Sequence, residues 1–279
     1  MIDSHAHLIA SDRARYPLLP GVGDRGNGVL ERAVDGPRLL ELMDGAGVGH
    51  AVLVHFSHIH GDDSSYVLDI AAEHRQRLAA VCCFDAQAPG AVERLEGWVR
   101  RGAGGMRLVA PNRESDASYA RNHAIWSRCA ELNIVLKVHF SVPLYEAGMA
   151  AMEAMVPAHP DTVVVLDHLA NPPWNPASPD LGMERLLALA AYPNLHLLVS
   201  TINLNRTLAA GVHAWQAIDL LVAAYGSRRL MWGSDIPNSA GDYADMVAQI
   251  TSALERLTPE DRTNLLHDTA ARLFGFSPL

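Results

Sequence analysis

The sequence is poor in positive charge and almost lacks lysine. Its 279 residues include 22 basic side chains against 31 acidic ones, which gives a formal net charge of −9, and Lys137 is the only lysine. Proteins that hold nucleic acids by neutralising phosphates need a basic face. This composition supplies none, so we expect no nucleic-acid partner.

Long apolar runs and paired cysteines are also missing. No stretch approaches the roughly 18 uninterrupted apolar residues of a membrane-spanning helix, and residues 1–7 lack the basic and apolar segments of a signal peptide. The three cysteines are Cys82, Cys83 and Cys129, of which the adjacent pair would lie on opposite faces of a strand as small core residues. We therefore expect no membrane partner, no disulfide and a cytoplasmic location.

Apolar material for a large core is present, and it is arranged in alternating segments. Hydrophobic residues make up 49% of the chain and charged residues 19%, which excludes a mostly disordered protein. Short, β-branched apolar runs predict eight strands, at Ile2–His7, His50–His55, Leu78–Phe84, Gly104–Leu108, Ile134–Phe140, Thr162–Asp167, Leu195–Thr201 and Leu230–Gly233. Helical patterns follow them at Pro37–Ala46, Ser64–His74, Ala88–Arg100, Ser118–Leu132, Pro143–Ala158, Leu181–Ala191, Ala209–Tyr225 and Asp242–Arg256.

This alternation predicts the fold class. A strand followed each time by a helix, eight times over, is typical of an α/β protein that closes into a single (β/α)8 TIM barrel, here over residues 1–279. An open, doubly wound sheet would show a glycine-rich turn after the first strand, where this chain has His5-Ala6-His7-Leu8. Helical segments near Pro259–Leu266 and Ala270–Phe274 predict an extra C-terminal helix.

Ionisable residues end several of the predicted strands. The first ends in His5 and His7, the fifth in Lys137 and His139, and the sixth runs into Asp167-His168. Strand four ends in Arg107, and strand eight leads into Ser234-Asp235. Strand ends converge at one mouth of such a barrel, the face that carries active sites. Burying so many titratable groups together is costly unless they are paired or hold a cation.

The motifs at these ends resemble those of the amidohydrolase superfamily. They are His5-x-His7, His139, Asp167-His168-Leu169-Ala170-Asn171-Pro172, Trp232-Gly233-Ser234-Asp235-Ile236-Pro237 and the closing Ala270-Ala271-Arg272-Leu273-Phe274-Gly275. The sixth- and eighth-strand motifs are most similar to the amidohydrolase-related, lactonase-like group, which includes 2-pyrone-4,6-dicarboxylate lactonase and sugar-acid lactonases. The same set includes zinc decarboxylases of the aminocarboxymuconate semialdehyde type.

The resemblance implies a site for one divalent metal, or for none. Binuclear members usually bridge two metals with a carboxylated lysine on strand four, where this chain has Met106 and Arg107. The mononuclear decarboxylases imply a zinc ligand set of His5, His7, His139 and Asp235, and a smaller set omits His139. Zinc suits imidazole and carboxylate ligands and needs an open position for water or substrate. In the lactonase the histidines polarise the carbonyl without metal.

The same resemblance assigns catalytic roles. Asp235 would accept the proton of the attacking water, and His168 would act across the site as an acid/base or as an oxyanion donor. Arg107 suits a substrate carboxylate, because a guanidinium binds a carboxylate in a fork, and a salt bridge in the barrel rim is the alternative. His55, Ser57 and Asn171 are the further expected substrate contacts. His58 and His60 fit a solvated loop better, and Trp174 is a candidate for a pocket wall.

Two enzymatic functions remain open from the sequence, and a pure binding protein built on the barrel is a third alternative, which the intact motifs at the strand ends disfavour. Hydrolysis of a lactone, or of a related ester or amide, of a small carboxylated molecule is favoured by the motifs of strands six and eight. Non-oxidative decarboxylation is favoured by His139, which the metal-free lactonase pattern lacks. Strand seven departs from the Lys-Leu-Ser-Gly pattern of the lactonase group, because it reads Val199-Ser200-Thr201. The outer helices leave room for a homodimer, although no contact patch in the sequence argues for one.

Overall fold

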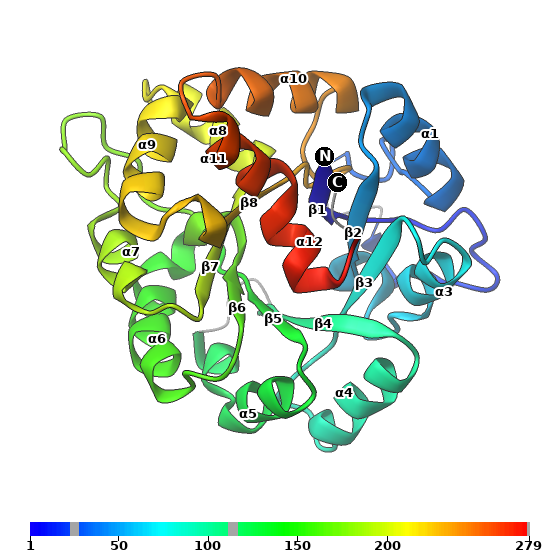
Figure 1. Ribbon diagram of the computed structural model, residues 1–279. Coiled ribbons are helices and arrows are strands. Elements are labelled where there is room, and N and C mark those ends of the chain that lie inside the picture. Colours follow the sequence, from blue (N-terminus) through cyan, green and yellow to red (C-terminus); the bar gives the residue numbers. More distant parts are fainter. Residues whose placement is uncertain (23–27, 111–116, 278–279) are drawn as a thin grey trace.

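The protein folds as a nearly closed barrel of eight parallel strands, which follow one another around the ring in chain order (Figure 1). The computed structural model describes residues 1–22, 28–110 and 117–277. The strands are β1 (Ile2–Ala6), β2 (His50–Val54), β3 (Leu78–Cys83), β4 (Ala103–Leu108), β5 (Val135–Val138), β6 (Val164–Leu166), β7 (Leu195–Ser200) and β8 (Leu230–Gly233). The predicted (β/α)8 barrel is confirmed.

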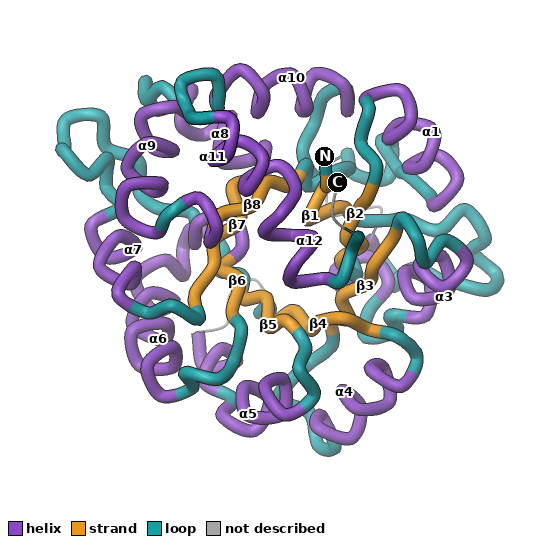
Figure 2. Tube along the Cα trace, in the orientation of Figure 1, coloured by secondary structure: helices purple, strands orange, loops and turns teal. Residues whose placement is uncertain are grey.

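Helices surround the ring of strands, as Figure 2 shows. The α-helices of the described residues, of which α12 alone lies across the centre of the ring, are α1 (Gly36–Ala46), α2 (Ser57–His60), α3 (Ser65–Glu73), α4 (Ala91–Arg100), α5 (His123–Glu131), α6 (Tyr145–Ala158), α7 (Glu184–Ala188), α8 (Thr201–Ala209), α9 (Ala214–Tyr225), α10 (Tyr243–Ala253), α11 (Pro259–Thr263) and α12 (Thr269–Phe274). Within the described residues, none is long and apolar enough to cross a membrane. All three cysteines are buried and free, as expected.

The last strand meets the first through backbone hydrogen bonds. The Asp235 N–H donates to the His5 carbonyl over 2.8 Å, and the His7 N–H donates to the Ile236 carbonyl over 2.7 Å. A Cβ atom at Gly233 would lie only 2.6 Å from the His5 Cβ, so a side chain there would push the two strands apart. The absence of a side chain at Gly233 thus lets the His5–His7 segment and the Asp235 loop lie together.

The barrel interior is layered, apolar at one end and charged above. Val135, Val165, Leu198 and Met231 form an apolar cluster, against which Leu273 and Phe274 of the C-terminal segment pack. In Figure 1, α12 crosses the barrel opening, which confirms the predicted extra helix and gives it the role of a plug. Side chains two residues apart on a strand share a face. Val135 and Val165 face the interior, so the next inward-facing side chains toward the carboxyl ends of their strands are those of Lys137 and Asp167. A charged layer therefore lies directly above the apolar one.

Several element boundaries differ from the predictions. Strand seven ends at Ser200, and α8 begins at Thr201, where the sequence predicted strand and then loop. The single helix predicted over Ala209–Tyr225 is wrong at its start, because Gly211 adopts a left-handed φ of 76° and separates α8 from α9. The helix predicted from Ser118 is broken at Asn122, whose side chain accepts a hydrogen bond from the Ile125 N–H and caps α5. Polar capping groups override helical periodicity at such points.

Candidate active site

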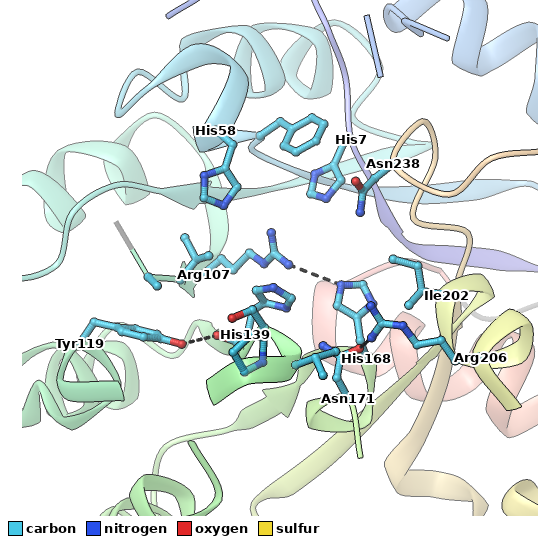
Figure 3. Close-up of a pocket in the computed structure, with 16 residues that line it drawn as sticks. His7, His58, Arg107, Tyr119, His139, His168, Asn171, Ile202, Arg206 and Asn238 are labelled. Atoms are coloured by element: carbon cyan, nitrogen blue, oxygen red, sulfur yellow. Dashed lines mark hydrogen bonds between the residues drawn. The ribbon is translucent and has the colours of Figure 1, made fainter. Parts of the chain in front are cut away.

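A cavity of about 410 Å³ opens at the carboxyl ends of the strands. Its volume lies in the usual range of small-molecule sites. Figure 3 shows that histidine and arginine side chains from several strands and loops point into it. The lining residues are His7, Phe56, His58, Arg107, Val109, Ala110, Tyr119, His139, Ser141, Val142, Pro143, His168, Asn171, Ile202, Arg206 and Asn238.

Three of the four predicted metal ligands meet beside this cavity. The Nε2 atoms of His5 and His7 are 3.2 Å apart. Asp235 Oδ1 lies 3.7 Å from the first of these nitrogens and 3.3 Å from the second. All three side chains are buried, and the three ligand atoms form a group that could hold a metal ion.

The protonation of the two rings shows why a cation fits between them. His7 Nδ1 lies 2.7 Å from the Val54 carbonyl, which can only accept, so Nδ1 carries the proton. His5 Nδ1 lies 3.4 Å from a carboxylate oxygen of Asp167; the two atoms are not aligned as a hydrogen bond, but the negative charge of the carboxylate favours a proton on Nδ1. Both Nε2 atoms therefore present lone pairs to each other and to Asp235 Oδ1, which has no hydrogen-bond partner among the described residues.

The spacing of these atoms also fits a metal. Ligand atoms around a tetrahedral zinc ion with bonds of about 2.1 Å lie about 3.4 Å apart. The observed separations of 3.2, 3.3 and 3.7 Å bracket that value. The other carboxylate oxygen of Asp235, Oδ2, accepts a hydrogen bond of 2.9 Å from the Asn238 side chain.

His139, the fourth predicted ligand, does not belong to this group. It follows β5 and lines the cavity, and its ring centroid is 5.2 Å from that of His168. Burial and the nearby Arg107 lower the pKa of His139 well below its usual value, so the ring is neutral. His139 therefore faces the cavity beside the group formed by His5, His7 and Asp235.

Asp167 anchors the charged layer under the site. Its carboxylate lies 3.1 Å from Lys137 Nζ and 2.8 Å from Arg107 Nε, and it also faces His5 Nδ1. Burial would raise the pKa of Asp167, but Lys137, His5 and Arg107 together hold it well below its usual value. An acidic group that orients a ligating histidine fixes which nitrogen faces the metal. Asp167 has this position toward His5.

His168 begins a left-handed turn at the end of β6. Four consecutive residues other than glycine, His168 to Asn171, have φ values between 53° and 59°. This conformation costs roughly 1–2 kcal/mol per residue, so it persists only where surrounding contacts hold it. The turn directs both His168 and Asn171 into the cavity (Figure 3). Burial lowers the pKa of His168 to about 4, which keeps its ring neutral near pH 7.

Arg107 forms the salt bridge that the sequence offered as one alternative, and it also lines the cavity. Its Nε is paired with Asp167, and its guanidinium lines the cavity with one nitrogen 3.5 Å from His168 Nε2. Asn171 also lines the cavity, where its side-chain nitrogen donates to the Phe140 carbonyl over 2.6 Å and its oxygen accepts from Arg206.

The remaining predicted contacts lie away from the cavity wall. His55 is buried, and its Nε2 lies 2.7 Å from the Gly61 carbonyl, which gives it a structural partner. Ser57 is hydrogen-bonded to Cys83. We expected His58 and His60 in a solvated loop, but both lie on the short helix α2. His60 is buried between the Pro17 carbonyl and the Ala10 N–H. His58 lines the cavity. Trp174 lies against a separate small apolar pocket.

Several site residues were missed from the sequence. Ser200 ends β7 and contacts His168, and its position at a strand end was a usable signal. Arg206 and Asn203 lie on α8, a helix that the sequence did not predict, so nothing marked them as site residues. Asn238, which holds Asp235, lies in the loop after β8.

Comparison with known proteins shows what the chain is similar to. A family model described as amidohydrolase matches residues 2–276. A relative from Burkholderia multivorans named L-fucono-1,5-lactonase is 28% identical, over 98% of this chain and 95% of its own length. An amidohydrolase from the same species, solved with bound zinc, matches with a TM-score of 0.74 and 25% identity over 99% of both chains. A putative 2-pyrone-4,6-dicarboxylic acid hydrolase from Pseudomonas putida matches with a TM-score of 0.78 and 25% identity, over 100% of this chain and 98% of its own.

Proposed function

Since the chain belongs to the amidohydrolase family and resembles lactonases over its whole length, we propose that it hydrolyses the ring ester of a small lactone. The observation that carries this proposal is the group of three lone-pair atoms, from His5, His7 and Asp235, at the wall of a cavity of about 410 Å³. Two guanidinium groups, of Arg107 and Arg206, face the same cavity. Such a site suits a compact, oxygen-rich substrate.

His5, His7 and Asp235 would hold one divalent metal, for which zinc is our choice. A metal bound there would polarise an ester carbonyl and lower the pKa of a water molecule. His139 and His168 face the cavity near these ligands.

The protein's own residues would carry the proton and orient the substrate. Water forms a bond to the carbonyl carbon, the ring C–O bond breaks, and one water proton passes by way of Asp235 to the departing ring oxygen. The product is an open-chain hydroxy acid. The Arg107 guanidinium, which lines the cavity, would donate to the oxygen that becomes negative, and a positioned cation of this kind stabilises the transition state more than the ground state.

Decarboxylation is the weaker alternative. The sequence favoured it through His139 as a fourth metal ligand, and the structure leaves this ring outside the group of ligand atoms. Ring opening releases acid without CO2, whereas decarboxylation releases CO2, so the two reactions are separable in one assay.

Metal removal gives the direct test of the site. We expect protein purified without chelator to carry close to one zinc per chain, and chelation to lower the rate of lactone opening by at least about 100-fold, because the carbonyl loses its main polarising charge. Activity should return when zinc is added back. The measurement is metal content by elemental analysis beside acid release from L-fucono-1,5-lactone and other sugar-acid lactones. CO2 release from carboxylated substrates, with no ring opening, would refute the proposed reaction.

Arg206 is the expected contact for an oxygen-rich part of the substrate. Its guanidinium is half-buried, it donates to the Asn171 oxygen, and no ion pair joins it to a carboxylate within the described residues. Arg206→Gln should raise KM about 10-fold with a small change in kcat, since it removes binding common to ground and transition states. Steady-state kinetics measures this split. Arg15→Gln, which changes an exposed arginine paired with Asp69, is the control and should leave both constants unchanged.

A further inference from the structure

His168 faces the cavity through one nitrogen and the protein interior through the other. Its Nδ1 lies 2.8 Å from Ser200 Oγ, at the junction of β7 and α8. An isolated imidazole–hydroxyl contact leaves the direction of the proton open, because either group can donate. The neighbours of Ser200 resolve this direction.

The side chain of Asn203 has a fixed orientation. Its Nδ2 donates to the His168 backbone carbonyl over 2.8 Å, and its Oδ1 accepts from the Ser200 backbone N–H over 3.0 Å. A backbone carbonyl can only accept and a backbone N–H can only donate, so these two partners exclude the flipped amide. Asn203 Oδ1 is therefore an acceptor toward every group that it contacts.

That acceptor determines where the Ser200 hydroxyl proton points. Ser200 Oγ lies 3.0 Å from Asn203 Oδ1, and the contact is a hydrogen bond only if the hydroxyl donates. The hydroxyl has a single proton, so toward His168 the serine oxygen offers a lone pair. The proton between His168 and Ser200 consequently belongs to Nδ1 of the ring.

A second contact, on the opposite side of the ring, agrees with this assignment. A guanidinium nitrogen of Arg107 lies 3.5 Å from His168 Nε2, and Figure 3 shows the pair across the cavity. A guanidinium has donors only, so it faces a lone pair there.

We infer that Ser200 and Asn203 are positioning residues that hold His168 as the Nδ1-protonated tautomer, with Nε2 as a hydrogen-bond and proton acceptor in the cavity. This inference rests on the proposed function for its catalytic consequence: His168 acts as a base or as the acceptor for a substrate hydroxyl group, and the oxyanion is left to Arg107. A lactone that carries a hydroxyl group beside its carbonyl offers the donor that this acceptor needs.

The test is the protonation of the ring itself, followed through Ser200→Ala. Long-range proton–nitrogen NMR spectra of protein with labelled histidine distinguish protonated from bare ring nitrogens, and the signals of His168 are identified by their loss in His168→Gln. We expect protonated Nδ1 and bare Nε2 in the unchanged protein. In Ser200→Ala, which removes only the hydroxyl, we expect a mixture of tautomers.

Kinetics complete the test. Ser200→Ala should lower kcat about 10- to 100-fold, the usual effect of losing a residue that orients a functional histidine, with little change in KM or zinc content. Thr207→Val is the matched control, because it removes a buried hydroxyl on the adjoining helix α8, whose proton goes to the Leu204 carbonyl. The control should keep both the spectrum and kcat.

Two results would overturn the inference: a protonated Nε2 in the unchanged protein, or a Ser200→Ala variant with an unchanged His168 spectrum. The NMR measurement needs no substrate, so its outcome is independent of whether the protein opens lactones. Failure of the proposed function would appear instead as absent ring opening beside the expected tautomer.

Discussion

Asp235→Asn is expected to lower kcat/KM for ring opening by about 1,000-fold or more, since it removes both a metal-binding charge and the group that takes the water proton. Asparagine is nearly isosteric and tolerates the left-handed φ of 60° at this position, so the fold should persist. Kinetics with zinc analysis and circular dichroism would show the loss of activity and metal in a folded protein.

The control for this variant is Asp219→Asn. Asp219 is partly exposed and lies 3.8 Å from Arg256, and it is not among the residues that line the cavity. It should keep full activity and zinc content. An Asp235→Asn protein with the activity of this control would show that our assignment of the site is wrong.

Lys137→Met is expected to lower the free energy of unfolding by about 3–5 kcal/mol, the usual cost of breaking a buried ion pair by removing one partner. Lys137 is completely buried, and its Nζ lies 3.1 Å from Asp167 and 3.3 Å from the Ser4 carbonyl. Methionine fills similar space, but it removes the positive charge that faces Asp167 Oδ1 and leaves Arg107 as the remaining cationic side chain paired with this buried carboxylate. Urea unfolding followed by circular dichroism measures the change.

Arg228→Met supplies the comparison for this stability effect. Its side chain is 78% exposed and lies 3.4 Å from Glu260, which is 74% exposed. Water screens such a pair, so its loss should leave the unfolding free energy nearly unchanged. Equal stability of the two variants would contradict a stabilising role for the Lys137–Asp167 pair.

The buried ion cluster explains how the site keeps its geometry. Asp167 compensates Lys137 and Arg107 and at the same time faces His5 Nδ1. Charges held at fixed positions in a dry interior need no reorganisation when a reaction develops charge nearby. The stability of the barrel and the orientation of His5, one of the proposed metal ligands, therefore depend on the same carboxylate.

The barrel could be predicted from the sequence because its signals are local. Apolar β-branched runs alternate with helical patterns, and each pattern reports the burial of its own segment. The convergence of His5, His7, His168 and Asp235 followed from one rule, that the ends of parallel strands meet at one mouth of a barrel. These parts needed no knowledge of side-chain direction.

The sequence did not predict helix α8, because no turn separates it from the strand before it. It begins directly at the end of β7, so strand and helix patterns merge around Ser200 and Thr201. Arg206 and Asn203 were missed with it.

The sequence by itself determined the barrel, its extra C-terminal helix and the set of titratable residues at its mouth. Only the tertiary structure decided which atoms meet: it separated His139 from the three ligand atoms, gave Asp167 its two cationic partners and placed Ser200 against His168. The physical reason is that the alternation of buried and exposed side chains depends on residues close together in the sequence. Distances, tautomers and a left-handed turn depend instead on contacts between segments far apart in the chain, whose combined packing energy holds conformations that no local preference favours.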